Sequence, residues 1–414
     1  MFNKKNKNNI VTIIDIGSIK IVCLIAIMQD NGDYQIISSS YCKSKGFRAG
    51  VITNRKLLQN SILTALESAE QSAEVRVEKA YIIFSSDKVK SVIVDSDIQL
   101  KGSVITAANI KNLTEYTIEN FNIKDHEIIN FNPVTYSIDN IKGIENPEGL
   151  FGHKLKLMMQ ITVLPTSIVY NMINCIADCQ IDIEEIDLSA ISSSYSCLNE
   201  DEKKIGAILL DIGGACASFA YYHNSKLLYS GSVPFGGDNI TNDIAKTLSI
   251  SLKSAERAKI LYGSSLISFA DSHKLLELAI NDNDESEICN VSNAKLNQII
   301  ASRIEEIFEL INDCMLKKNN FQNHSDYRVV LTGGTSLLPG IENIAGNIFK
   351  AKIRLAKPAK IENLHKVADM VVFAASLGML KKISQKVNNN FYIKDKNNPK
   401  SYLGAIIEWF KESF

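Results

Sequence analysis

Residues 205–218, IGAILLDIGGACAS, form an apolar run that ends in an aspartate and two glycines. Near the amino terminus, another apolar run ends in DIGSIK at residues 15–20. Runs of this length that stop at glycine are typical of buried strands ending in a tight turn. Two further apolar runs follow each turn, so the chain carries two copies of one strand-turn-strand unit. We therefore expect a duplicated domain with a cleft between its halves.

The bulk composition is that of an ordinary globular protein. The chain has 414 residues, which is enough for two or more subdomains with large cores. Its 45 lysines and arginines nearly balance its 46 acidic residues. This balance argues against a nucleic-acid binder held by net positive charge. Any affinity for anions must be local.

The eight cysteines show no metal-ligand spacing. The closest pair, Cys175 and Cys179, would lie one helical turn apart with no histidine beside it, so we expect reduced and mostly buried thiols. The apolar residues 10–28 could mimic a signal peptide, but Asp15 and Lys20 interrupt them and no small-residue cleavage site follows. Two strands explain this segment better, and no stretch is long and uncharged enough to span a membrane.

The pattern of apolar and polar residues changes several times between the two repeats and after them. Short strand patterns around one helix pattern, between about residues 84 and 160, predict an inserted α+β module. The run DEKK at residues 201–204 reads as a charged turn, and residues 281–287, NDNDESE, as a polar and acidic stretch. Residues 293–316 predict a long helix, and the Asn/Lys-rich residues 386–400 predict a linker.

Glycine at a strand-turn-strand lets backbone N–H groups approach a phosphate, and an aspartate at the strand end can hold Mg²⁺ through water. Residues 329–340, VVLTGGTSLLPG, predict a third strand that ends in Gly333 and Gly334 and opens a helix, whose N-terminus suits an anion. The sequence has no P-loop and no GxGxxG motif. The alternative interpretation is structural turns whose aspartates cap their own loops.

In order along the chain, the motifs DIGSIK, NPEGLFGHKLKL, DIGG, VPFGGDNITNDIA, AERAKILYG and LTGGTSLLPG resemble the actin-like ATPase superfamily and, within it, the FtsA family of bacterial cell-division proteins. The resemblance covers nearly the whole chain. It implies an α/β fold of duplicated actin-like (ribonuclease H-like) domains around a nucleotide cleft, with an inserted small α+β subdomain. The implied divisions are a first actin-like domain (1–83 and 162–204), the inserted subdomain (84–161), a second actin-like domain (205–236 and 308–386), a small subdomain (237–307), a linker (387–400) and an amphipathic membrane-targeting helix (401–414).

The resemblance also implies ATP and Mg²⁺ as ligands. Asp15 and Asp211 would stand on either side of the Mg²⁺ and hold it through water, with Lys20 contributing charge to the phosphates. The other implied nucleotide residues are Gly17, Ser18, Gly213, Gly214, Gly236, Gly237, Asp238, Glu256, Lys259, Gly333, Gly334, Thr335 and Ser336. Without the resemblance, Glu256 and Lys259 fit an ordinary pair on one helix face.

The second turn departs from the family pattern. Members usually continue it with a third glycine and a threonine, where this chain has Ala215 and Cys216. The alanine methyl limits close approach, and a thiol hydrogen-bonds more weakly than a hydroxyl. We expect nucleotide binding to survive on the remaining contacts and ATPase activity to be weak or absent. The sequence identifies no catalytic residue.

The last fourteen residues, 401–414, have a helical period. Their apolar stripe, edged by the only tryptophan, is Leu403, Ile406, Ile407, Trp409, Phe410 and Phe414. A short helix of this kind after a polar linker suits a membrane interface. Because its charges nearly cancel, one copy would bind weakly and several copies on a polymer would bind well. The alternative is a helix docked on the protein's own body.

The resemblance implies a peripheral protein on the cytoplasmic face of the inner membrane at the division site. It would bind ATP, form filaments, tether the tubulin-like protein FtsZ to membrane lipid and recruit later division proteins, with no role for nucleic acid. Arg303 and Glu306 on the long helix are candidate FtsZ contacts, or equally an intrahelical pair. Two alternatives share the fold: a metabolic kinase or phosphotransferase, and an actin-like adaptor of pilus assembly.

Overall fold

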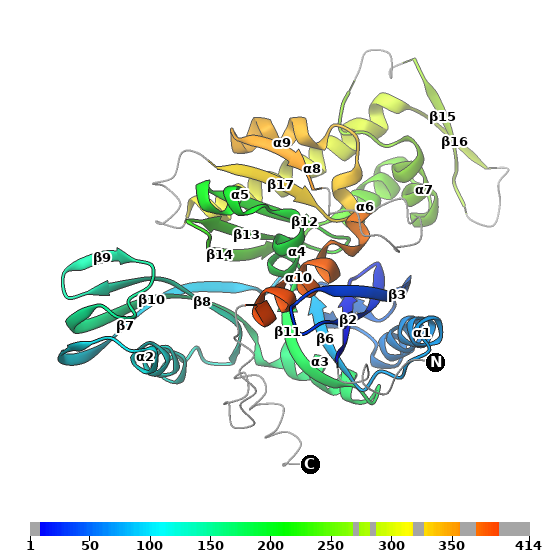
Figure 1. Cartoon of the computed structure of the whole chain (residues 1–414). Coiled ribbons are helices and arrows are strands. Elements are labelled where there is room, and N and C mark those ends of the chain that lie inside the picture. Colours follow the sequence, from blue (N-terminus) through cyan, green and yellow to red (C-terminus); the bar gives the residue numbers. More distant parts are fainter. Residues whose placement is uncertain (1–8, 268–272, 282–286, 318–326, 357–369, 389–414) are drawn as a thin grey trace.

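Two five-stranded sheets with the same topology form the two halves of the molecule (Figure 1). The computed structural model describes residues 9–267, 273–281, 287–317, 327–356 and 370–388. The first sheet has the order β11-β6-β1-β2-β3 and the second β18-β17-β12-β13-β14. In each sheet the first three strands in sequence pair antiparallel and the other two pair parallel. The predicted duplication is therefore confirmed.

The strands of the two sheets correspond one to one. They are β1 (Ile10–Ile16), β2 (Lys20–Met28), β3 (Tyr34–Lys43), β6 (Lys79–Phe84) and β11 (Asp182–Leu188) in the first, and β12 (Ala207–Ile212), β13 (Ala217–His223), β14 (Lys226–Val233), β17 (Arg328–Thr332) and β18 (Lys352–Leu355) in the second. Each of the two Asp-Ile-Gly motifs lies at the end of its sheet's central strand, β1 or β12. Both turns therefore lie at equivalent positions.

Helices cover both faces of the first sheet, because its central strands are apolar on both sides. Ile14 and Ile16 of β1 pack with α1 (Arg55–Ala73) and α3 (Thr166–Ala177). On the other face, Ile13 and Leu24 pack against α10 (Ala374–Asn388). This burial of alternate residues on opposite faces is what a strand in the middle of a three-layer structure requires.

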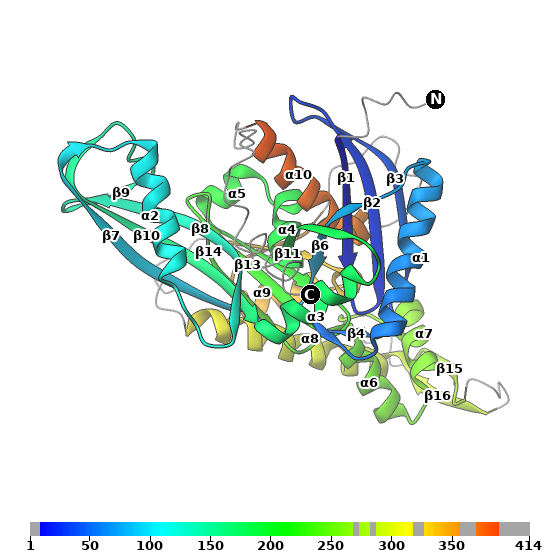
Figure 2. The ribbon, with the colours of Figure 1, turned by 90° about the horizontal axis from the view of Figure 1, so that it is seen from below.

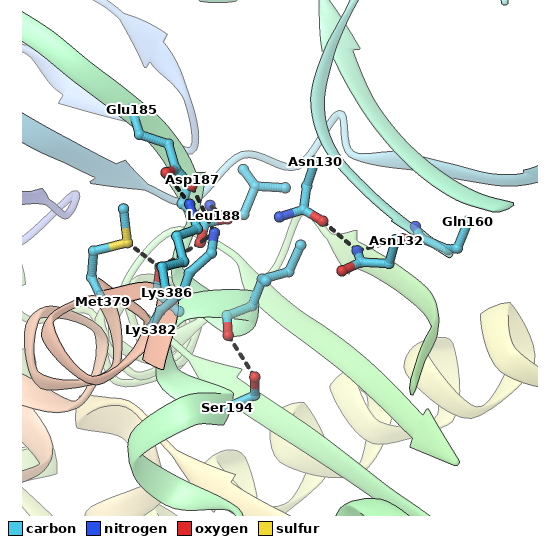
Figure 3. A network of polar contacts seen from close by, with 12 residues as sticks. Asn130, Asn132, Gln160, Glu185, Asp187, Leu188, Ser194, Met379, Lys382 and Lys386 are labelled. Atoms are coloured by element: carbon cyan, nitrogen blue, oxygen red, sulfur yellow. Dashed lines mark hydrogen bonds and ion pairs between the residues drawn. The ribbon is translucent and has the colours of Figure 1, made fainter. Parts of the chain in front are cut away.

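The position of α10 differs from the expectation that residues 308–386 all belong to the second half. A buried ion network holds α10 to β11 of the first sheet (Figure 3). The Lys382 ammonium lies 2.7 Å from an Asp187 carboxylate oxygen and 2.8 Å from one of Glu185, and Lys386 pairs with Glu185 at 2.5 Å. Burial alone would raise the pKa of Glu185, but the two ammonium groups lower it to about 2. The chain thus returns to its first half after β18.

The second sheet packs on α6 (Gly237–Leu248), α8 (Asn293–Leu316) and α9 (Ile341–Phe349) through one face. Its other face meets α4 (Ser189–Cys197). Because α4 also packs on α10, it lies between the two halves, as Figure 1 shows. Gly378 of α10 fits this contact because a Cβ there would lie 1.8 Å from the Ser192 carbonyl oxygen.

The inserted module is an antiparallel sheet with one helix, and it projects to one side of the molecule (Figure 2). Its strands have the order β7-β10-β8-β9, and α2 covers one face. The elements are β7 (Lys90–Val104), α2 (Ala107–Glu119), β8 (His126–Ile138), β9 (Ile141–Ile144) and β10 (Phe151–Pro165). The predicted α+β insert is therefore present.

Two parts of the chain differ from the sequence prediction. The DEKK segment is not a turn but lies in the helix α5 (Glu200–Ile205), which a capping box between Asn199 and Glu202 begins. The acidic stretch near residue 284 is flanked by a hairpin, β15 (Leu275–Ala279) and β16 (Ile288–Ser292), which the sequence analysis did not predict. Together with α6, α7 (Leu252–Tyr262) and α8, this hairpin forms a small subdomain.

Short elements complete the fold. They are the ribbon β4 (Phe47–Arg48) and β5 (Val51–Ile52), and the 3-10 helices η3 (Gly334–Leu337) and η4 (Met370–Phe373). The Gly333-Gly334 segment was expected to open a helix directly. Instead it leads into η3, and α9 begins only at Ile341, because Gly340 adopts a left-handed conformation between them.

Candidate functional site

A cavity of about 520 Å³ lies where the two halves meet. Its walls come from the turn after β1, the turn after β12, the starts of α6 and η3, and the residues just before and within α10. This volume is in the range of pockets that hold a nucleotide-sized molecule. All of the predicted nucleotide residues line the cavity except Gly236 and Ser336.

The first turn is built by Gly17. Its N–H donates to the Lys20 carbonyl oxygen at 2.9 Å, and a Cβ at this position would lie 2.8 Å from the same oxygen. The Ser18 hydroxyl accepts a hydrogen bond from the Ala49 N–H at 3.1 Å. A backbone hydrogen bond therefore closes the turn, and the Ala49 N–H holds it in place through Ser18. Because Gly17 has no side chain, the backbone of the turn is open to the cavity.

The second turn is fixed by hydrogen bonds from α6. The Gly213 carbonyl oxygen accepts from the Gly237 N–H at 2.9 Å, and the Gly214 carbonyl oxygen accepts from the Asp238 N–H at 2.8 Å. Gly236 is needed for this contact because a Cβ there would lie 2.5 Å from the Gly213 oxygen. Gly236 thus allows the start of α6 to pack on the second turn, although it does not itself line the cavity.

The third glycine loop packs directly against the second turn. Gly333 has φ +86°, and a Cβ there would lie 2.6 Å from a carboxylate oxygen of Asp211. The Thr335 hydroxyl donates to the Gly213 carbonyl oxygen at 3.1 Å, while the Ser336 hydroxyl donates to that of Gly333 at 2.7 Å. A Cβ at Gly334 would meet no atom within 4 Å, so this residue borders open space.

Asp15 and Asp211 are two of the four acidic residues of the cavity wall, and they lie at the ends of the central strands of the two sheets. Burial raises the pKa of Asp15 to about 7, with Lys20 opposing the shift and Asp211 adding to it. Burial likewise raises the pKa of Asp211 to about 6, against the effects of Lys20 and of a hydrogen bond from Ser193. Burial disfavours the ionised form of both carboxyls, and a divalent cation between them would stabilise both charges.

Glu256 and Lys259 lie on α7 at the cavity wall and are joined to each other, at 2.7 Å between the ammonium and a carboxylate oxygen. Lys259 also donates to the Thr241 hydroxyl at 2.8 Å and to the Gly237 carbonyl oxygen at 3.1 Å. Thr241 in turn donates to Glu256. This network fixes α7 to the start of α6, so both side chains hold set positions beside the cavity.

Several lining residues were not predicted from the sequence. Ser189 and Ser193 come from α4, and the Ser193 hydroxyl donates to Asp211 at 3.4 Å. The apolar walls include Phe47, Ile260, Leu261, Val371 and Val372. The serines follow β11 directly, so the end of that strand was the only local signal for them.

Ala215 and Cys216 also line the cavity, and both are buried. Burial, reinforced by Asp211, Asp87 and Asp238, raises the pKa of the Cys216 thiol to about 12, so the thiol is neutral. All eight cysteines are free thiols, and five of them are buried. The cavity therefore has a neutral, weakly hydrogen-bonding side chain at the end of the second turn.

Arg303 and Glu306 form an intrahelical ion pair on α8. Arg303 also bonds Asp243 of α6 at 2.5 and 3.0 Å, and its guanidinium lies 5.5 Å from the Phe235 ring centroid.

The six stripe residues of the tail, from Leu403 to Phe414, lie outside the described residues. Within the described part of the chain, no helix is long and apolar enough to cross a membrane.

Solved structures share the fold at low sequence identity. The type IV pilus PilM-PilN complex matches with a TM-score of 0.62 and 13% identity, covering 90% of this chain and 98% of the other. MreB5 of Spiroplasma citri bound to ADP matches with a TM-score of 0.53 and 12% identity, covering 92% and 99%. The actin-like α/β fold is therefore shown.

Two family models match separate parts of the sequence. Residues 208–378 match "Cell division protein FtsA", and residues 86–163 match "SHS2 domain inserted in FTSA". Cell division protein FtsA of Agrobacterium fabrum is 26% identical over 99% of this chain and 96% of its own length. That of Neisseria meningitidis serogroup B is 28% identical over 98% of both chains. Since these matches run through both halves and the insert, the chain belongs to the FtsA family of cell-division proteins.

Proposed function

We propose that this protein is an ATP-binding scaffold of the division machinery. It binds ATP with Mg²⁺ between its two halves, associates with further copies of itself, and tethers FtsZ to the cytoplasmic face of the inner membrane at the division site. The observation that carries the nucleotide part is the convergence of two glycine turns and two aspartates, one of each from either half, on one cavity. The structures of Spiroplasma citri MreB5 bound to ADP and to AMPPNP support the same use of this fold.

Asp15 and Asp211 would hold the Mg²⁺, and the backbone of the two turns with Lys20 would bind the phosphates. The metal would supply charge that offsets the phosphates. Ala215 and Cys216 leave the second turn with a weaker set of hydrogen-bonding groups than a glycine and a threonine would. We therefore propose that the nucleotide acts as a switch or structural brace, with weak or absent hydrolysis.

The membrane and partner roles rest on the family and on the tail sequence. Residues 401–414 would lie in the membrane interface, and several tails on one filament would bind together. Later division proteins would then be recruited to the same filament. Because Arg303 already bonds Asp243 and Glu306, only part of its guanidinium is available to FtsZ.

Liposome co-sedimentation tests this function with the full chain and with a version ending at Lys400, each with and without ATP. The full chain should pellet with anionic liposomes and bring purified FtsZ with it, more so with ATP, while the shortened chain should stay in the supernatant. Equal pelleting of the two would show that the tail is not the anchor. Phosphoryl transfer from ATP to a small molecule, unchanged by the truncation, would favour a metabolic kinase instead.

The similarity to the PilM-PilN complex favours a pilus-assembly adaptor as the second candidate. Both family matches and the full-length relatives name FtsA, which weighs against it. Binding to FtsZ separates the two, because a pilus adaptor has no need of it.

A further inference from the structure

An ion pair joins the two halves at the rim of the cavity. Arg48 ends the short strand β4 of the first half, and Asp238 is the second residue of α6. The Arg48 guanidinium lies 3.4 Å from an Asp238 carboxylate oxygen. The Arg48 side chain is 52% exposed and that of Asp238 is 23% exposed, so the pair lies at the boundary between cavity and solvent.

Asp238 occupies a position that an anionic ligand would find unfavourable without a compensating cation. Its N–H donates to the Gly214 carbonyl oxygen, and its carboxylate lies 3.2 Å from where a Cβ on Gly214 would be. Burial raises the pKa of Asp238 and Glu256 adds to this effect, while Arg48 and Lys259 oppose it. Lys259 is paired with Glu256 of its own helix. The cation that pairs with Asp238 is Arg48, which comes from the opposite half.

An apolar contact accompanies the ion pair. Ile19, at the tip of the first turn, lies so close to Gly214 that a Cβ on this glycine would be 2.4 Å from Ile19 Cγ1. Arg48 is linked to the same turn through its neighbour Ala49, whose N–H donates to the Ser18 hydroxyl. Opening the cleft at this rim would separate both Ile19 from Gly214 and Arg48 from Asp238.

We propose that Arg48 is a latch, whose ion pair with Asp238 holds the two halves together over a bound nucleotide and sets the rate of its release. The inference rests on the proposed nucleotide function. Nucleotide leaves only after the rim opens, so loss of the pair raises the dissociation rate more than it lowers the association rate. Because the pair is partly exposed, its removal should speed release about three- to fivefold.

Stopped-flow displacement of a fluorescent ATP analogue with Mg²⁺ measures this rate. Arg48→Ala should release the analogue about three- to fivefold faster at low salt, with the difference shrinking at high salt because exposed ion pairs are screened. The matched control is Arg55→Ala, since Arg55 is also 52% exposed and pairs with Asp178 away from the cavity. The control should match the wild type. Equal release by Arg48→Ala and the wild type would overturn the latch.

Two further variants separate a latch from simple charge neutralisation. Arg48→Lys, which keeps a cation opposite Asp238, should release the analogue more slowly than Arg48→Ala. Arg48→Ala with Asp238→Asn should stay fast, because no pair crosses the rim. If that double variant recovers the wild-type rate, Arg48 acts only by neutralising Asp238 and the latch is wrong.

Hydrogen exchange of the nucleotide-free chain supplies a readout that needs no ligand. Arg48→Ala should exchange faster than the wild type and than Arg55→Ala in peptides spanning residues 16–21 and 47–52, and equal exchange would contradict the latch. If the wild type binds no analogue, the proposed nucleotide function fails. The exchange result then decides separately whether Arg48 holds the halves together.

Discussion

At the residue scale, the second turn has Ala215 and Cys216 where the sequence resemblance leads us to expect a glycine and a threonine. Ala215 and Cys216 are both buried in the cavity wall, and the Cys216 thiol is held neutral. The rest of the turn is fully supported, since Gly213 and Gly214 accept hydrogen bonds from α6. The departure therefore changes the groups that face a ligand and leaves the frame of the turn in place.

Introducing the expected glycine and threonine tests how much this departure weakens nucleotide binding or turnover. The double variant Ala215→Gly, Cys216→Thr should bind ATP about three- to tenfold more tightly or raise ATP turnover, because a hydroxyl supplies roughly one good hydrogen bond. Isothermal titration calorimetry and phosphate release measure the two effects. Cys314→Thr, on α8 and outside the cavity wall, is the control and should change neither. No change in the double variant would show that the departure is silent.

Asp15 gives a prediction about stability with a definite sign. Its pKa rises from about 4 in the unfolded chain to about 7 in the folded protein, so the folded state favours the protonated form. The stabilisation that protonated Asp15 gives to the folded protein is therefore fully present below about pH 4 and is lost as the pH rises through 7. At pH 8 the ionised carboxylate then opposes folding in the nucleotide-free protein.

Asp15→Asn should therefore be more stable than the wild type without nucleotide at pH 8. The gain should reach at most about 4 kcal/mol, which corresponds to the shift of about three pKa units, and it should vanish near pH 4. Urea unfolding at pH 4, 6 and 8 measures it. A difference that stays constant with pH would contradict the assigned pKa.

The sequence predicted the turn residues because turn chemistry is local. A glycine after a strand and an aspartate at its end can be recognised without knowing what lies opposite, as Asp15 and Gly17 illustrate. Ser193 could not be predicted in this way, because its role depends on the contact between α4 and Asp211 of β12 in the other half. Arg48 was missed for the same reason, because its partner Asp238 is distant in sequence.

At the element scale, α10 connects three features of the molecule. Residues at and just before its start line the cavity, and its middle is fixed by Lys382 to Asp187 and Glu185. Its last residues, up to Asn388, are helical although the sequence predicted that the linker begins before them. Its return to the first sheet could not be predicted from periodicity, which shows that a segment is helical and not which sheet it covers. The β15–β16 hairpin was missed because its strands are short and flank a polar stretch.

Lys382→Met should destabilise the protein by about 3–5 kcal/mol, because it leaves the fully buried Asp187 carboxylate without its cation. The adjacent Lys381→Met should cost less than about 1 kcal/mol, as is usual for substitutions away from such networks. Urea unfolding of both variants at neutral pH provides the comparison. Similar losses in the two would show that the network does not anchor α10.

At the scale of the whole molecule, the cavity exists only because the two halves are held together. The two sheets share one topology, and each contributes one glycine turn and one aspartate to the cavity. The sequence predicted this arrangement because the repeated unit is visible in it, whereas the contacts between the halves depend on the assembled fold. α4, packed between α10 and the second sheet, joins the halves on the side of the cavity that carries Ser189 and Ser193.

Isothermal titration calorimetry of the purified chain with ATP, with and without Mg²⁺, tests most directly that the two halves make one nucleotide site. One site per chain is expected, with binding weakened at least tenfold by omission of Mg²⁺ and by either Asp15→Asn or Asp211→Asn, because each acid comes from a different half. Binding that needs only one of the two aspartates, or no binding of ATP by the folded wild type, would contradict the account.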